Sequence, residues 1–170
     1  MPGRSLTFDP IDEARRQWEQ RWPDAALAMA AATSIMRAQQ LVLAEVDRAL
    51  RDLDLTFARF EALALLSFSR SGELPIGKLG PRLMVHPTSV TNVVDRLEAQ
   101  GFVERRAHPT DRRMTMVVIT DAGRRAVAEA ADVVNEVRFG LGALSDEDLD
   151  ALVASIRSLR KPAAAAAVEG

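Results

Sequence analysis

The stretch that decides the fold is residues 76–120, which read IGKLGPRLMVHPTSVTNVVDRLEAQGFVERRAHPTDRRMTMVVIT. The pattern predicts a short helix, a turn at Met84–Val85, a second helix over residues 86–100, and then a strand, a basic loop and a strand. The second helix carries apolar residues at the i, i+3, i+4, i+7 spacing of one buried helix face. These residues are Val90, Val93, Val94 and Leu97. Gly101 marks the end of that helix, and the hairpin follows directly.

The other side of this second helix is small and hydrogen-bonding. Its first two turns carry Thr88, Ser89, Thr91 and Asn92. The loop of the hairpin that follows contains Arg112 and Arg113. A helix with hydroxyls and an amide at its leading end fits the major groove of DNA, and an arginine-tipped hairpin beside it fits the adjacent minor groove. The sequence therefore predicts a winged helix-turn-helix core in a mostly α fold with a small β-wing.

The composition limits the classes of protein that the chain can form. Its 170 residues fit one domain with extensions, and its 48% apolar content allows a sizeable core. The absence of cysteine excludes disulfides, thiolate zinc sites and thiol redox sensing. No uninterrupted apolar run approaches the roughly 20 residues that span a bilayer, and the N-terminus lacks the apolar core of a signal peptide. We therefore expect a cytoplasmic protein with no membrane partner and no cofactor.

Charge is unevenly distributed, although the net charge of the whole chain is only −2. Residues 76–125 contain nine basic and five acidic residues, a net charge of +4, whereas the remainder carries 13 basic and 19 acidic residues. A positive module on a negative body attracts phosphate at one face and repels it elsewhere. Because uneven scatter of surface charge is common, this asymmetry supports a DNA-binding interpretation without deciding it.

The chain divides into a central lobe and flanking segments. Residues 1–23 are expected to form an N-terminal extension with a short helix, and residues 55–120 the winged lobe. Residues 24–54 and 121–160 are predicted to form long amphipathic helices, because their apolar stripes continue for many turns. Residues 161–170, a proline followed by an alanine run, are expected to be a disordered tail.

The apolar stripes of the flanking helices exceed what a core of about 70 residues can cover. A second copy of the chain is the simplest cover, so we expect these helices to be dimerisation helices. A two-fold dimer would hold two recognition helices about 34–36 Å apart on one side of DNA. The alternative is that the long helices pack on one another within a single chain.

Residues 88–123, TSVTNVVDRLEAQGFVERRAHPTDRRMTMVVITDAG, resemble the MarR family of bacterial transcription regulators. The shared motifs are the helix end Arg-Leu-Glu-x-x-Gly, the wing opening Val-Glu-Arg-Arg, the tip Asp-Arg-Arg and the exit Thr-x-x-Gly, and the helix order matches over about 24–159. The resemblance implies a homodimer with a helical body and two winged lobes, which represses transcription from a near-palindromic operator on double-stranded DNA. It also implies release from DNA when a small, often aromatic, anionic effector binds between the helices and the lobe.

The resemblance implies DNA contacts at the start of the second helix and in the wing. The residues concerned are His86, Pro87, Thr88, Ser89, Thr91, Asn92, Arg96, Asp111, Arg112 and Arg113. Asn92 could pair bidentately with adenine, and Arg96, one turn further, is placed to hold a phosphate. Thr88 and Ser89 could instead serve as helix caps.

Within the wing, Asp111 is expected to pair with Arg113 and so to fix the loop. Either Arg112 or Arg113 could then enter the minor groove. His108, in the same loop, could contact phosphate or have no role.

The N-terminal helix resembles that of the urate-responsive branch of the family, where a tryptophan at the position of Trp18 reaches the effector. Arg106 matches an arginine of that branch, whereas Glu61 and Val93 replace its acidic residue and its second arginine. We therefore expect a different aromatic acid, with Trp18 stacking on its ring, Arg106 pairing with its carboxylate and Glu61 nearby. The alternative is that Trp18 and Trp22 only fasten the extra helix to the rest of the protein.

Two other classes of function compete with this interpretation. A winged helix can serve as a protein–protein interaction module without a DNA role, but an apolar or acidic leading face would then be expected on the second helix. An enzyme is disfavoured because the chain has no phosphate-cradling glycine loop, and a metal-sensing regulator because its two histidines, His86 and His108, have no carboxylates at ligand spacing. The sequence does not identify the effector, the operator or the direction of the response.

Overall fold

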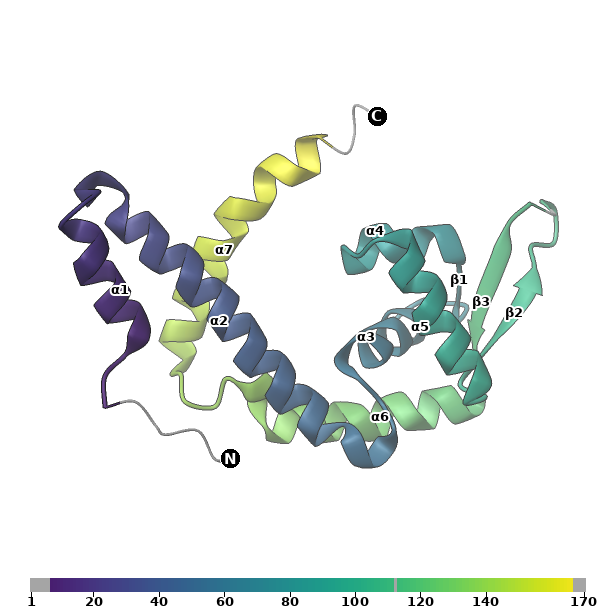
Figure 1. Ribbon diagram of the computed structural model, residues 1–170. Coiled ribbons are helices and arrows are strands. Elements are labelled where there is room, and N and C mark those ends of the chain that lie inside the picture. Colours follow the sequence, from purple (N-terminus) through teal and green to yellow (C-terminus); the bar gives the residue numbers. More distant parts are fainter. Residues whose placement is uncertain (1–6, 112, 167–170) are drawn as a thin grey trace.

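The computed structural model describes residues 7–111 and 113–166, and the side chains of these residues up to Arg160. The chain is mostly helical, with a helical body at one end and a lobe carrying a small sheet at the other (Figure 1). The helical body comprises α1, α2 and α7, and the lobe comprises α3 to α6 with the three strands. The helices are α1 Pro10–Glu19, α2 Ala26–Ala49, α3 Phe57–Ser67, α4 Leu79–Leu83, α5 Pro87–Ala99, α6 Asp121–Glu136 and α7 Asp146–Ala166. The strands are β1 Glu73–Pro75, β2 Val103–Ala107 and β3 Thr115–Ile119.

The sheet is antiparallel in the order β1-β3-β2, so the predicted hairpin β2–β3 gains a third strand. In the hairpin Val103 lies opposite Ile119, and Ala107 lies opposite Thr115. β1 pairs Leu74 with Val117. The sequence analysis did not predict β1, because three residues that end in a proline are too short to show an alternating pattern.

The core of the lobe lies between α3, α5, α6 and the sheet. Its largest fully buried side chains include Leu63 and Leu66 of α3, Leu97 of α5 and Val117 of β3. The apolar face predicted for α5 is confirmed, because Val90, Val94 and Leu97 are buried and Val93 is partly buried against the same cluster. α3 lies at the centre, as its nearly continuous apolar surface predicts.

α6 was expected to be a dimerisation helix, but its buried face belongs to the lobe. Val127, Ala130 and Val134 join the same buried cluster as α3, and α3 is the element with which α6 makes its most extensive contact. The stripe that the sequence shows on this helix is therefore covered within the chain over much of its length. The predicted domain boundary at residue 120 falls between the hairpin and α6. Residues on both sides of this boundary contribute to one and the same core.

The junction between the wing and α6 explains the Thr-x-x-Gly motif. Thr120 is the N-cap of α6: its Oγ1 accepts a hydrogen bond from the Gly123 amide at 3.0 Å and donates to the Gly101 carbonyl oxygen at 2.8 Å. A Cβ on Gly123 would lie 2.1 Å from the carbonyl oxygen of Phe102. Only glycine allows α6 to begin this close to the end of the α5–β2 turn.

Both ends of α2 differ from the predicted range of residues 24–54, and the start of α3 is capped from outside its own segment. α2 begins at Ala26, after a 3₁₀ turn at Pro23–Ala25, and not at Asp24; it stops at Ala49, followed by a 3₁₀ turn at Arg51–Leu53. Thr56 precedes α3, but its side chain does not cap the helix. The amide of Phe57 instead donates to Oδ1 of Asp47 at 2.7 Å. A carboxylate ten residues away takes the capping role, and local sequence could not reveal that.

A sharp turn follows α6, within the predicted helical range of residues 121–160. α6 ends at Glu136, and Arg138, Phe139 and Gly140 all have positive φ angles, of 47°, 52° and 74°. The Phe139 ring packs on Phe60 of α3 with ring centroids 6.4 Å apart. The turn is held by this contact, although the two non-glycine residues lie in a conformation that costs free energy.

The segment predicted to be a disordered tail, residues 161–170, overlaps the end of α7. α7 continues through Pro162 to Ala166, while residues 167–170 lie outside the described residues. Alanine has the highest helix propensity, so the alanine run continues the helix even though proline lacks an amide donor.

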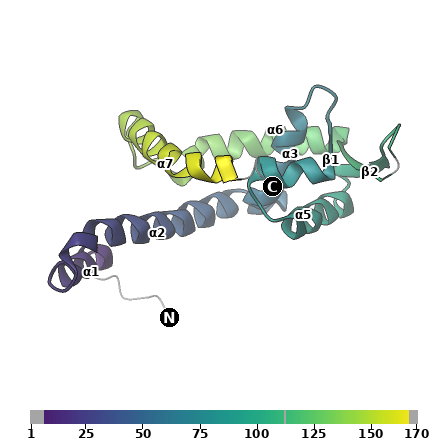
Figure 2. The same ribbon diagram turned by 90° about the horizontal axis from the view of Figure 1, so that it is seen from above.

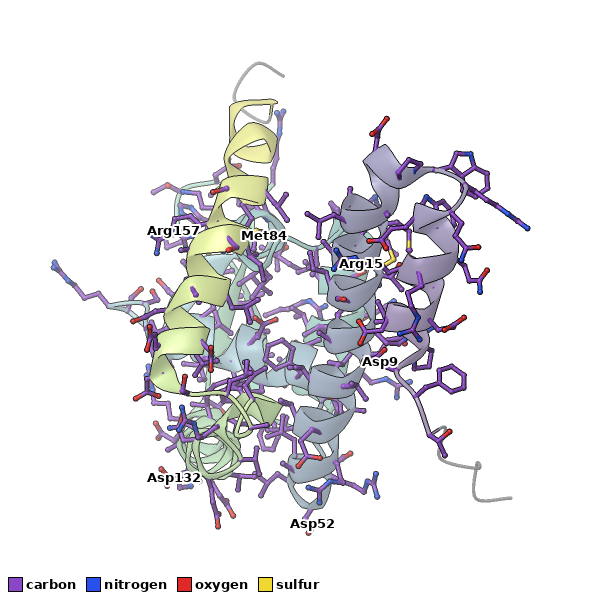
Figure 3. The ribbon with its side chains drawn as sticks, turned by 90° about the vertical axis from the view of Figure 1, so that its left-hand side faces the viewer. Asp9, Arg15, Asp52, Met84, Asp132 and Arg157 are labelled. Atoms are coloured by element: carbon purple, nitrogen blue, oxygen red, sulfur yellow. The ribbon has the colours of Figure 1, made fainter. Side chains whose placement is uncertain are left out.

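The helical body leaves much of its apolar surface uncovered. On α2 the exposed large apolar residues are Leu27, Ile35, Met36, Leu41 and Leu43, and on α7 they are Leu152, Val153 and Leu159. Within the described residues, α7 packs extensively on no other element. Figure 2 shows α2 extending from the lobe to α1, with α7 set apart from α2 and its C-terminal end directed back toward the lobe, and Figure 3 shows α1, with Asp9 and Arg15, on the side of α2 away from α7. By length and composition alone, the helix Pro23–Ala49 could also cross a membrane.

Candidate nucleic-acid interface

The start of α5 is built by a proline and an unusual cap. His86 is the N-cap, and its Nδ1 accepts a hydrogen bond from the amide of Thr88 at 3.3 Å. Pro87 occupies the first helical position, where a missing amide costs nothing. The start of the helix is therefore fixed by the imidazole of His86, and the hydroxyl of Thr88 is not used for capping.

Every residue predicted to contact DNA from α5 is exposed. Thr88, Ser89, Thr91, Asn92 and Arg96 all lie at the solvent-facing side. Only one of their side chains bonds within the helix, Thr91, whose Oγ1 donates to the Pro87 carbonyl oxygen at 3.4 Å. The leading end of α5, from Thr88 to Asn92, is thus polar, uncharged and accessible, as a helix that reads base edges requires.

A cleft of about 500 Å³ runs along the C-terminal half of this face. Asn92 and Arg96 of α5 form one wall, and Thr56 and Arg59 at the start of α3 lie opposite. Gln100 closes the end of the cleft, because its side-chain amide donates to the carbonyl oxygen of Asp54 at 2.8 Å and accepts from Arg59 Nη1 at 3.1 Å. This network joins the recognition helix to the loop that leaves α2.

The wing is shaped by its own loop residues. Nδ1 of His108 accepts hydrogen bonds from the amides of Thr110 and Asp111, at 3.3 and 3.2 Å. Oδ1 of Asp111 accepts from the backbone amide of Arg113 at 3.0 Å. Asp111 therefore contacts Arg113 through the main-chain amide, and the side-chain ion pair expected between these two residues is absent from the part of the chain that the structure describes. Arg112 lies outside the described residues.

Sequence reasoning missed the role of His108. An isolated histidine in a polar loop gives no signal that its ring will accept hydrogen bonds from two following amides. The Pro-Thr-Asp sequence after it is the only available hint, because such residues favour turns in which a side chain accepts from the backbone.

Among the described basic residues of the positive module, Arg105 and Arg106 are neutralised by neighbours. Arg106 pairs with Glu104, and Arg105 pairs with Asp95 and Glu98 of α5. Burial lowers the pKa of Arg105, but its hydrogen bonds to these carboxylates outweigh that effect and raise the pKa above its ordinary value. The positive charge available to DNA is therefore concentrated away from the base of the wing.

The residues predicted to bind an effector do not meet within one chain. Trp18 is in α1 and packs against Trp22, with ring centroids 4.8 Å apart and ring planes tilted by 48°. Arg106 is in β2, at the opposite end of the molecule in Figures 1 and 2. Glu61 is partly buried in α3, and this burial raises the pKa of its carboxyl group.

The fold and the exposed face together define a winged helix-turn-helix protein. The model of the MarR family matches residues 55–115. The crystal structure of Sco5413, a MarR family transcriptional regulator from Streptomyces coelicolor, is 52% identical and has a TM-score of 0.76, covering 81% of this chain and 95% of that chain. The chain belongs to the MarR family of transcription regulators, whose members are DNA-binding proteins and not enzymes.

Other relatives agree over shorter stretches or at lower identity. The HTH-type transcriptional regulator MhqR of Bacillus subtilis is 33% identical over 92 residues, which are 54% of this chain and about three fifths (62%) of MhqR. Sco3205, a MarR family transcriptional regulator from Streptomyces coelicolor solved in complex with DNA, has a TM-score of 0.71 at 23% identity, covering 78% of this chain and 88% of that chain. At 23% identity, the likeness to Sco3205 shows a shared fold alone.

Proposed function

We propose that the protein is a homodimeric repressor that binds a near-palindromic operator and responds to a small aromatic or anionic molecule. The observation that carries this proposal is the exposed polar face of α5 beside the wing, on a lobe attached to helices whose apolar surface is left exposed by the described residues.

A second copy of the chain is the best cover for α2 and α7. The exposed residues Ile35 and Leu43 of α2 extend the face that Val46 buries against the lobe. On α7, Leu152, Val153 and Leu159 recur at helical spacing and form one apolar stripe. A membrane would not suit α2 as well, because Arg37, Gln39, Gln40 and Glu45 interrupt its exposed surface.

The dimer is tested by placing a charge in the apolar face of α2. Ile35→Glu should shift the protein from dimer to monomer in sedimentation at micromolar concentration, because an unpaired carboxylate would be buried at the interface. Ala128→Glu, on the exposed side of α6, adds the same charge and should leave the dimer intact. A wild-type protein that sediments as a monomer at this concentration would refute the homodimer.

DNA reading is tested by binding to a promoter fragment and to random duplex over a range of salt. Preference for the promoter fragment, with a steep salt dependence, is expected because each dimer should neutralise several phosphates. Asn92→Ala should cost about 1–3 kcal/mol of binding and relax the preference at one base pair. Asn135→Ala, an exposed asparagine on α6, is the matched control. Equal affinity for the promoter fragment and for random duplex would favour the alternative function, a protein–protein interaction module.

The wing is tested separately by replacing both arginines of its tip. Replacing both residues, Arg112→Ala with Arg113→Ala, should weaken binding to all DNA sequences by a similar factor and reduce the salt dependence of binding. The reason is that these residues are expected to contact groove edges and the DNA backbone. A loss confined to the promoter fragment would instead make the wing a reader of sequence.

The effector site is the least constrained part of the proposal. Because Trp18 and Arg106 lie at opposite ends of one chain, a site that contains both would have to be assembled across the dimer. Titration with salicylate should quench tryptophan fluorescence in the wild type and in Trp22→Phe, but not in Trp18→Phe. Quenching that persists without Trp18 would remove this residue from the site.

A further inference from the structure

Arg105, the middle residue of β2, is bound more tightly than any other arginine of the described wing. Its Nη2 lies 2.5 Å from Oδ1 of Asp95, and its Nη1 pairs with Oε2 of Glu98. Its backbone amide also donates to Oε1 of Glu98 at 3.0 Å. The side chain of Arg105 is only 26% exposed, against 61% for that of the neighbouring Arg106.

The two carboxylates come from the recognition helix. Asp95 and Glu98 are three residues apart on α5, so they lie on the same side of the helix, one turn apart. The planar guanidinium of Arg105 can bind both at once, which the single ammonium of a lysine cannot do with the same geometry. This group of three residues, the Arg105 clasp, is a side-chain ion-pair link between α5 and the wing.

The position of the wing depends on how its base is held. The hairpin extends for five paired residues per strand, or about 16 Å, beyond the point where β2 leaves α5. A rotation of about 10° at the base would therefore move the tip by roughly 3 Å, which is as long as a hydrogen bond. Contacts of the tip with one groove and of α5 with the next need a fixed angle between the two elements.

We propose that Arg105 is a positioning residue, which does not touch DNA but locks the wing to the recognition helix through Asp95 and Glu98 so that both reach DNA in register. The proposal rests on the proposed DNA-binding function. It also explains why two acidic residues stand on a helix that must approach phosphates, where uncompensated negative charge would oppose binding.

The rival account is that Arg105 contacts a phosphate and that the two acids are incidental. The two accounts predict opposite changes in DNA affinity when the two acidic residues are removed. If Arg105 contacts phosphate, Asp95→Asn with Glu98→Gln removes two repelling charges and releases the guanidinium, so binding should tighten. If the clasp positions the wing, the same double variant should weaken binding although it makes the protein more positive.

The experiment measures the affinity of full-length Asp95→Asn/Glu98→Gln for the promoter fragment that the wild type prefers. We expect a loss of roughly tenfold or more, the size of one or more lost wing contacts. Glu129→Gln, on the exposed side of α6, is the charge control and should bind as the wild type does or slightly tighter. Unchanged or tighter binding by the double variant would overturn the proposal.

A second set of variants separates the clasp from a simple loss of folding. Arg105→Met should weaken binding as the double variant does, Arg105→Lys should restore part of the affinity, and Arg106→Met should have a smaller effect. In the free protein, Arg105→Met should also speed amide exchange in β2 while the thermal transition of the lobe is largely kept. Exchange unchanged from the wild type would refute the clasp even if the protein binds DNA, whereas a wild type without DNA preference would refute the proposed function alone.

Discussion

The lobe and the helical body use similar apolar residues with opposite results. In the lobe, Leu63 and Leu97 are fully buried by other elements of the same chain. In the helical body, Leu41 is 70% exposed and Leu159 is 64% exposed. The lobe therefore completes its own core, whereas the helical body presents apolar surface that the described residues leave uncovered. An apolar stripe shows that a helix has a partner, but not whether the partner belongs to the same chain.

The largest change in the free energy of unfolding is expected from a substitution in the core of the lobe. Leu63→Ala should lower the free energy of unfolding by about 2–5 kcal/mol, because it leaves a cavity in a fully packed site. Phe68→Ala, at a position that is 83% exposed, should change it by less than about 0.5 kcal/mol. Urea denaturation followed by circular dichroism compares the two. Similar losses would mean that the lobe core is not as complete as its burial indicates.

The next largest effect concerns the close contact that joins the wing to α6. Gly123→Ala should cost about 1–3 kcal/mol, because the new Cβ would collide with the main chain of Phe102 and force α6 to shift. Gly142→Ala has open space around it and should be neutral or slightly stabilising. The same denaturation measurement tests both, and a neutral Gly123→Ala would show that α6 can move without cost.

The helical body should instead make stability depend on protein concentration. If a second copy covers α2 and α7, each tenfold dilution should lower the apparent free energy of unfolding by about 1.4 kcal/mol per dimer. Thermal unfolding at several concentrations measures this shift. A transition independent of concentration would mean that the exposed stripes do not contribute to the stability of the folded state.

The smallest expected effect comes from Glu61, whose carboxyl group is partly buried in the otherwise apolar α3. Because burial raises the pKa of Glu61 in the folded state, the folded protein binds its proton more readily than the unfolded chain does, and stability falls as pH rises through that pKa. Glu61→Gln should therefore stabilise the protein at neutral pH by less than about 1 kcal/mol, since water screens the half-exposed group. Chemical denaturation at pH 4 and pH 7 should show this gain fading at the lower pH, where the wild-type carboxyl is mostly protonated in both states. A gain of equal size at both pH values would point to packing and not to charge.

Much of the candidate interface could be predicted because its signals are local. The spacing of Val90, Val94 and Leu97 fixed which side of α5 is buried, and Pro87 fixed where the helix starts. Contacts between distant residues gave no such signal. The capping of α3 by Asp47 and the pairing of Arg105 with Asp95 join residues seven or more positions apart, and no periodicity reports them.

By itself, the sequence determined the helices, the hairpin and the polar leading face of α5, because each follows from side-chain periodicity or from residues within one turn of each other. Only the tertiary structure decided that α6 completes the core of the lobe, that β1 joins the sheet and that two acids of α5 hold the base of the wing. These arrangements depend on which surfaces meet when the chain closes on itself, and burial and ion pairing act through space regardless of separation along the chain.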